Sequence, residues 1–176
     1  IPAWCQPDRE RVLTTRDCYP PKVFPEAVTI VGSGVTGVEF VHMFSSFGAK
    51  VTLVVSRQQV LPSKDPEVAA VLEDDFLRRG VQLLKGARAT AIDRVAGPDG
   101  KEEVVVRCDD GRVVHSSHAV LAIGSVPNTD GLGLEAAGVE LDGGGYVTIN
   151  RHCQSNVGHI YAAGDIASCL SPFDEM

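Results

Sequence analysis

The feature that most constrains this chain is the glycine pattern GSGVTG at residues 32–37, which lies between two runs of different periodicity. The run before it, AVTIV at 27–31, is short and β-branched, as a buried strand is. After it, apolar residues recur at helical spacing over 35–47, and Gly48 predicts the end of that helix. A strand, a glycine turn and a helix in this order predict the start of a βαβ unit with parallel strands.

The same alternation continues beyond the first helix. KVTLVV at 50–55 predicts a second buried strand, and VQLLKG at 81–86 predicts a third. Between them, Asp65 followed by Pro66 is a strong helix start, and Gly80 ends that helix. We expect its apolar face to be formed by Val68, Val71, Leu72 and either Phe76 or Leu77.

The rhythm changes after residue 86. Three strand-like runs follow, ARATAIDRVA, EEVVVRC and RVVHSSHAVLAI, separated by the turn signals GPDG and DDG. They predict an antiparallel meander, and GGGYVTIN (143–150) and GHIYAAGD (158–165) predict two further short strands. The expected fold is α/β: a Rossmann-like three-layer domain with helices on one face of a parallel sheet and an inserted three-stranded antiparallel meander on the other. Residues 1–25, rich in proline, predict an extended lead-in.

Composition narrows the function classes. The formal net charge of −7 argues against nucleic acid as a partner, and no apolar run approaches the roughly 20 residues of a membrane span. Five cysteines without a C-x-x-C pair favour reduced thiols and a cytoplasmic location. Because the chain starts at Ile1, we expect a segment of a longer protein. We expect no metal site, since each histidine and cysteine group offers too few ligands: Cys108 with His115 and His118, and Cys153 with His152 and His159.

The three glycines suit a dinucleotide. Gly32 permits the tight turn, Gly34 lets a pyrophosphate approach the backbone, and Gly37 allows close packing of the helix. The first helical N–H groups, next to Ser33 and Val35, then face the phosphates with a partial positive charge. The alternative is a purely structural glycine turn in an unrelated α/β protein.

The end of the second strand bears on which dinucleotide is bound. A site for NAD commonly carries an acid there, which binds the ribose 2′-hydroxyl. Here Ser56 occupies that place and Arg57 follows it. A hydroxyl and a cation can accept a 2′-phosphate, whereas Arg57 can also be simply solvated. We expect tolerance of NADPH, with the choice between NADH and NADPH left open.

Several segments together resemble one family. GSGVTGVEF (32–40), VLPSKDPEV (60–68), AIGSVPNTDGLGLEAAGVEL (122–141) and GHIYAAGDIA (158–167) are ordered and spaced as in the pyridine nucleotide-disulfide oxidoreductases, the FAD enzymes related to dihydrolipoamide dehydrogenase and glutathione reductase. ERVLTTRDCY (10–19) resembles the linker between their FAD and nucleotide domains. The SR after the second strand is similar to that of actinobacterial NAD(P)H:quinone reductases.

The resemblance assigns further residues to cofactor binding. It implies that Glu39 lies near nicotinamide and flavin, and that the Gly124 backbone lies along the nicotinamide half. Ala89 matches a position near the adenine, and Asp165 matches an aspartate that binds the FAD ribitol. Val35 stands where some relatives carry an aromatic gate, so we expect none here. No catalytic residue is assigned within the chain.

The resemblance also implies an organisation for the parent protein. Residues 1–25 would be a linker from an FAD domain, 26–150 the NAD(P)-binding domain and 151–176 a return segment toward the FAD domain. The cofactors would be NAD(P)H and, in the full-length enzyme only, FAD; the full-length enzyme would be a homodimer with FAD and dimerisation domains. Hydride would pass from NAD(P)H to FAD and on to a quinone. The alternatives are a disulfide reductase such as dihydrolipoamide dehydrogenase, and a non-catalytic NAD(P)H-sensing module.

Overall fold

The computed structural model describes residues 1–97 and 100–169, and it divides the chain into two compact units. The first unit is Ile1–Gly124, and the second begins at Ser125. Each unit has its own hydrophobic core. The division of the parent protein at residues 25 and 150 stays a prediction.

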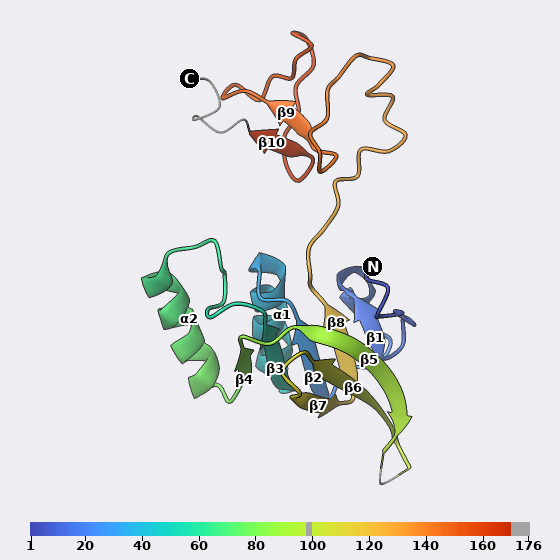
Figure 1. Cartoon of the computed structure of the whole chain (residues 1–176), viewed down its shortest axis with the longest axis vertical. Helices are drawn as coiled ribbons and strands as arrows, with labels where there is room; N and C mark the ends of the chain where they lie inside the picture. The colour runs from blue at the N-terminus through green and yellow to red at the C-terminus, as the bar shows by residue number, and fades with distance from the viewer. Residues whose placement is uncertain (98–99, 170–176) are drawn as a thin grey trace. The chain divides into compact units, whose positions relative to one another are not determined.

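A five-stranded parallel sheet forms the middle of the first unit (Figure 1). Its strand order is β1-β8-β2-β3-β4, so the first strand of the chain lies at one edge, and β8, the last to join, lies between β1 and β2. The strands are β1 (Val12–Thr14), β2 (Ala27–Val31), β3 (Lys50–Val55), β4 (Gln82–Lys85) and β8 (His118–Leu121).

The faces of this sheet are covered by different elements, which makes three layers. Helices α1 (Val35–Ser46) and α2 (Pro66–Arg78) share one core with Leu53 of β3, while Val54 belongs to a second core. The second core includes Val104 and Val106 of an antiparallel sheet, which Figure 1 shows crossing the parallel strands. Its strands, in the order β5-β6-β7, are β5 (Ala89–Ala96), β6 (Glu102–Cys108) and β7 (Val113–Ser116). The expected three-layer α/β fold is confirmed.

The run at 112–123, expected as one strand of the meander, is instead two strands in two sheets. Its first part is β7, and its second part is β8 in the parallel sheet. The switch occurs at polar residues: the Ser116 Oγ lies 2.9 Å from the Thr29 Oγ1, and the Ser117 Oγ donates a 2.6 Å hydrogen bond to the Ala27 carbonyl. These bonds hold the junction beside β2, so β8 starts in register with it.

The buried face of helix α2 agrees only in part with the one expected. Ala69 and Phe76 are buried, whereas Val68 is 58% exposed and Val71 is 68% exposed. Leu72 and Phe76 are the expected residues that do pack against the core. Two overlapping stripes of helical spacing exist in this segment, and the small Ala69 lets the helix approach the sheet more closely than a valine stripe would.

The lead-in is more than an extended segment. Val12 pairs with Ala119 of β8, so the lead-in supplies the edge strand β1. A 3-10 helix, η1 (Thr15–Cys18), follows it. Before the strand, the Asp8 Oδ1 accepts backbone hydrogen bonds from Glu10 and Arg11, each 2.8 Å long.

The second unit contains one two-stranded parallel sheet in its described part, β9 (Val147–Ile149) with β10 (Ala167–Cys169). The prediction of a strand at 143–150 is therefore confirmed in position. The prediction at 158–165 is wrong, because that segment forms only a single bridge, between Gln154 and Tyr161. Across the described residues of both units, no helix is long and apolar enough to cross a membrane.

Candidate functional site

The turn between β2 and α1 is tight because two of its glycines touch other backbone atoms. Gly32 has a φ of 110°, and a Cβ there would lie 2.3 Å from the Ala122 carbonyl oxygen. A Cβ on Gly37 would lie 2.0 Å from the Gly32 carbonyl oxygen. These two positions therefore exclude any side chain, and they hold the start of α1 against β2 and β8.

Gly34 differs from its two neighbours in the pattern. A Cβ there would meet no atom within 4 Å, and its φ of −70° is open to any residue. Packing and backbone strain therefore give no reason for glycine at this position. Open space beside the backbone is what a bound pyrophosphate requires, so the turn fits a dinucleotide.

The amino end of α1 is chemically open as well. Gly34 is its N-cap, no side chain caps it, and its first turn contains no acid. The first helical N–H groups therefore keep their partial positive charge for an external anion. Beside them, Val35 is 54% exposed and Glu39 is exposed, and the Glu39 carboxylate has no partner among the described residues.

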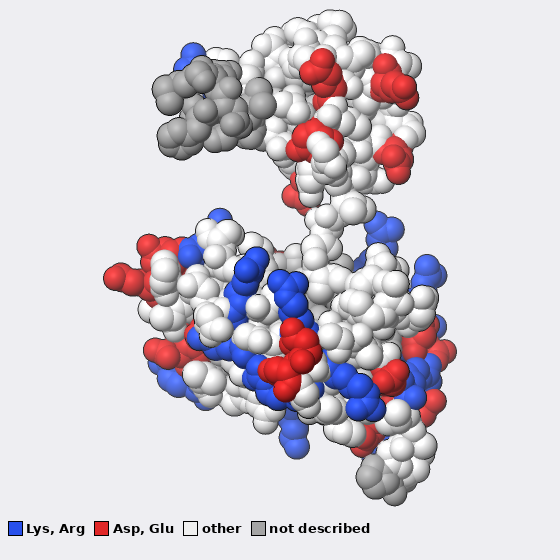
Figure 2. All heavy atoms as spheres, in the orientation of Figure 1, with Lys and Arg blue, Asp and Glu red and all other residues white. Residues whose placement is uncertain are grey.

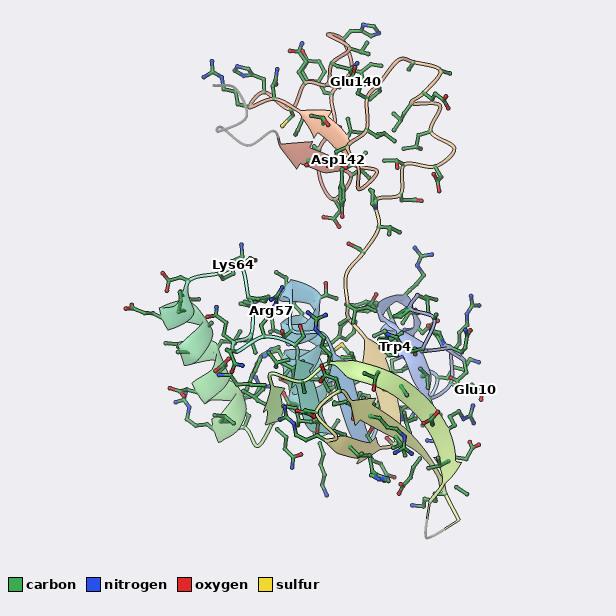
Figure 3. All side chains as sticks on the ribbon, in the orientation of Figure 1. Trp4, Glu10, Arg57, Lys64, Glu140 and Asp142 are labelled. Carbon is green, nitrogen blue, oxygen red and sulfur yellow. The ribbon has the colours of Figure 1, made fainter. Side chains whose placement is uncertain are left out.

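A second loop lies against this turn. The Leu61 N–H donates a 2.8 Å hydrogen bond to the Ser33 carbonyl, which ties the loop after β3 to the glycines. Ser56 and Arg57 begin this loop, and both are exposed. Figure 3 shows Arg57 and Lys64 on it, at the edge of the sheet from which α1 starts. Within the described residues the Arg57 guanidinium has no hydrogen bond or ion pair.

A third loop, between β4 and β5, completes the edge. The Gly86 N–H donates a 2.9 Å hydrogen bond to the Arg57 carbonyl, so this loop lies directly beside Arg57. Arg88 follows on it, and its side chain is exposed. Arg88 was not among the residues predicted from the sequence. The signal for it is its position after the third parallel strand, since the carboxyl ends of parallel strands share one edge.

The remaining predicted residues lie at differing places. Ala89 is half-buried at the start of β5, where it packs against the second core. Gly124 has a φ of 119° and is the last residue of the first unit. Asp165 is exposed in the second unit.

In the described part of the chain, no three His, Cys, Asp or Glu side chains are placed to hold a metal ion. His118 is 3% exposed on β8, and burial lowers the pKa of its imidazole. Its Nδ1 lies 2.9 Å from the Ser117 Oγ. His115 is on β7 and contacts Glu103 instead, with 3.1 Å between the imidazole Nδ1 and the carboxylate.

Comparison with known proteins identifies the family. The model of the family described as pyridine nucleotide-disulphide oxidoreductase matches residues 6–174. The chain belongs to this family. An NAD(P)H dehydrogenase (quinone) of Mycobacterium tuberculosis is 47% identical over 165 residues, which are 94% of this chain and 32% of the relative. A dihydrolipoyl dehydrogenase of Zymomonas mobilis is 32% identical and matches 93% of the chain and 35% of its own length.

Solved structures of the family agree with the fold. The crystal structure of LpdA from Mycobacterium tuberculosis superimposes with a TM-score of 0.80 at 47% identity, covering 95% of this chain and 35% of that protein. The flavoprotein disulfide reductase RclA of Escherichia coli gives a TM-score of 0.78 at 25% identity, covering 94% and 36%. The chain therefore spans about a third of the length of these pyridine nucleotide-disulphide oxidoreductases.

Proposed function

We propose that this chain binds the pyridine nucleotide in a flavin-dependent oxidoreductase that takes hydride from NAD(P)H. The observation that carries the proposal is the amino end of α1, where Gly34 leaves open space and no side chain caps the helix. The oxygens of a pyrophosphate bound there would accept hydrogen bonds from the first helical N–H groups. Membership of the family supports the same function.

The chain's own part in the reaction is positioning. Gly32 and Gly37 hold α1 against the sheet, so the N–H groups that face the phosphates are rigid before the nucleotide binds. Glu39, one turn into the helix, and the Gly124 backbone are proposed to lie along the nicotinamide half, and Ala89 near the adenine. Bound FAD would supply the acceptor for the hydride. Asp165 is proposed as an FAD ligand in the parent enzyme.

The nucleotide preference is proposed to include NADPH. Ser56 stands in place of an acid directly after β3, and Arg57 offers an exposed cation that has no partner in the described part of the chain. A 2′-phosphate would therefore meet attraction in place of repulsion.

The electron acceptor is proposed to be a quinone, because the Mycobacterium tuberculosis relative at 47% identity is an NAD(P)H dehydrogenase of that kind. A second candidate is a disulfide substrate, which the dihydrolipoyl dehydrogenase at 32% identity favours. The parent is proposed to be a homodimer with FAD and dimerisation domains. It is proposed to work in the cytoplasm, where the thiols of Cys5, Cys18 and Cys108, which are buried and free, would stay reduced.

Calorimetric titration of the chain with NADH and NADPH tests the binding step. We expect either nucleotide to bind the wild type. The matched variant is Gly34→Asp, which places a carboxylate in the open space and should strongly weaken binding of both nucleotides. Binding that is unaffected by Gly34→Asp would contradict the proposed site, and no binding by the wild type would contradict the function of this domain.

The acceptor is tested on the full-length flavoprotein. Its yellow colour would show that FAD is bound, and NAD(P)H oxidation would be followed with a quinone or with lipoamide as the acceptor. We expect the quinone to support the faster turnover. Faster turnover with lipoamide would move the assignment to the second candidate.

A further inference from the structure

Two basic side chains, Arg57 and Arg88, flank the same edge of the parallel sheet from different loops. The backbone joins these loops twice, since Gly86 donates to the Arg57 carbonyl at 2.9 Å and Ala87 donates to the Val55 carbonyl at 3.1 Å. A Cβ on Gly86 would lie 3.1 Å from the Gln58 Nε2, so the side chain of Gln58 also spans the gap. Arg88 thus lies two residues after Gly86, which bonds directly to the Arg57 backbone.

The position of Arg88 is itself fixed by its backbone. Its N–H donates a 2.9 Å hydrogen bond to the Asp109 Oδ1, and its carbonyl accepts a 2.9 Å bond from the Asp109 N–H. Asp109 therefore anchors the main chain of Arg88 and leaves its guanidinium unpaired, because the described residues give that guanidinium no partner. The next acid, Asp110, is already engaged, with its Oδ2 lying 2.6 Å from Arg112.

The local charge makes this arrangement unusual for the protein. The chain carries a formal net charge of −7, and most of its arginines are paired with acids, as Arg94 and Arg107 are. Figure 2 shows Lys and Arg side chains gathered over the region where β4 leads into β5. Two exposed arginines without described partners, on adjoining loops beside the nucleotide edge, form a site for a compact dianion.

We propose that Arg88 is a second specificity-determining residue, which with Arg57 clamps the 2′-phosphate of NADPH between the β3–α2 loop and the β4–β5 loop. The proposal rests on the proposed nucleotide-binding function of the glycine turn. The ligand chemistry is a phosphate monoester on an adenosine ribose. NADH lacks this group, so Arg88 contributes nothing to its binding.

The test uses small probes that isolate the phosphate. Adenosine 2′,5′-bisphosphate carries the 2′-phosphate, and adenosine 5′-monophosphate lacks it; both are titrated into the chain by calorimetry. We expect wild type to prefer the bisphosphate by about tenfold or more, as charge-assisted hydrogen bonds to a phosphate allow. Arg88→Ala and Arg57→Ala should each remove about tenfold of affinity for the bisphosphate and leave the monophosphate unchanged.

Lys50→Ala is the matched control. Lys50 is exposed, has no side-chain partner in the described part of the chain and lies at the amino end of β3, the opposite end of the strand from Arg57. The Lys50→Ala variant loses the same charge as Arg88→Ala but far from the proposed site, so both affinities should stay unchanged. Arg88→Lys, which keeps the charge, should restore part of the affinity for the bisphosphate that Arg88→Ala loses.

The outcomes distinguish a failure of the phosphate clamp from a failure of the proposed nucleotide-binding function. If the bisphosphate binds as well to Arg88→Ala as to wild type, or if Lys50→Ala weakens it equally, the clamp is wrong while nucleotide binding stands. An equal loss for both probes in Arg88→Ala would make Arg88 a general phosphate contact and also overturn the clamp. If wild type binds neither probe and neither NADH nor NADPH, the nucleotide-binding function itself fails.

Discussion

Helices α1 and α2 each follow a strand of the same parallel sheet, but their amino ends are built in opposite ways. At α2 the Asp65 Oδ1 accepts hydrogen bonds from the N–H groups of Glu67 and Val68, at 2.8 and 3.4 Å, and Pro66 occupies the first helical position. At α1 the N-cap is Gly34, with no side-chain cap. At α2 the carboxylate of the chain itself satisfies the first N–H groups, so they do not bind an external anion. At α1 the first N–H groups stay free to bind one.

The difference teaches where to look for a ligand in this fold. Both helix starts carry the same partial positive charge, yet only the N–H groups at the start of α1 lack a side-chain acceptor. The two ends can be exchanged or altered by single substitutions, and each substitution separates binding from folding in its own way.

The largest effect is expected inside the α1 turn. Gly32→Ala should lower the free energy of unfolding by about 3 kcal/mol, because the new methyl group meets the Ala122 carbonyl and the φ of 110° disfavours a side chain. Gly34→Ala, in open space, should cost less than about 1 kcal/mol. Urea unfolding of the two variants measures this. Equal losses would show that the turn is looser than the contact distances imply.

The next effect makes α1 resemble α2. Gly34→Asp should weaken NADH and NADPH by about 100-fold, since the carboxylate takes the N–H groups and repels the pyrophosphate. The φ of −70° and the open space at this position accept the side chain, so the melting temperature should stay level or rise. Calorimetry and thermal unfolding on the same sample check both halves. A melting temperature that fell with affinity would point to misfolding instead.

The reverse change removes the internal cap of α2. Asp65→Ala should lower the free energy of unfolding by about 1 kcal/mol, the usual worth of an N-cap side chain. Nucleotide affinity should be unchanged, because α2 has no part in the proposed site. Denaturant unfolding and calorimetry measure the two quantities, and a loss of affinity would mean that the β3–α2 loop depends on this cap for its shape.

The smallest effect concerns a carboxylate that serves backbone N–H groups outside a helix. Partial burial opposes the charged form of Asp8, but hydrogen bonds from the Glu10, Val12 and Arg11 N–H groups and from Arg94 outweigh it and lower its pKa to about 2. A lowered folded-state pKa gives stability that is present above about pH 4 and lost as pH falls toward 2.

Asp8→Asn should therefore show a flatter decline of stability than wild type between about pH 4 and 2, measured by chemical denaturation at each pH. Glu10→Gln is the neighbouring control, since its backbone N–H bond to Asp8 is kept. Parallel curves for Asp8→Asn and wild type would contradict the lowered pKa.

Much of the first unit could be predicted because its signals are local. The strands at 27–31 and 50–55 agree with β2 and β3 residue for residue, and the helix expected from Val35 begins there. In these segments the apolar pattern, the glycines and the capping residues all point to one structure. The glycine turn was predicted for the same reason.

The errors arise where the outcome depends on contacts between distant segments. Nothing in the run at 112–123 shows that it changes sheets at Ser117, because the bonds that cause the change go to β2, some 90 residues earlier. The face of α2 was wrong at Val68 and Val71, because two apolar stripes overlap in this segment and contact with the sheet decides which one is buried. Arg88 was missed because the hydrogen bond between Gly86 and Arg57 joins two loops that are far apart in the sequence.

The polar junction between β7 and β8 also sets the register of β8 against β2. It sets Ser117 beside Ala27, and from there β8 runs in step with β2 until Val31 lies opposite Leu121. The next residue, Ala122, is the one whose carbonyl borders Gly32. A chain one residue longer or shorter over this stretch would bring a different carbonyl, and the opposite side-chain orientation, to the glycine turn. The shape of the proposed binding edge therefore depends on the hydroxyl groups at the opposite end of the sheet, because they fix the register of β8.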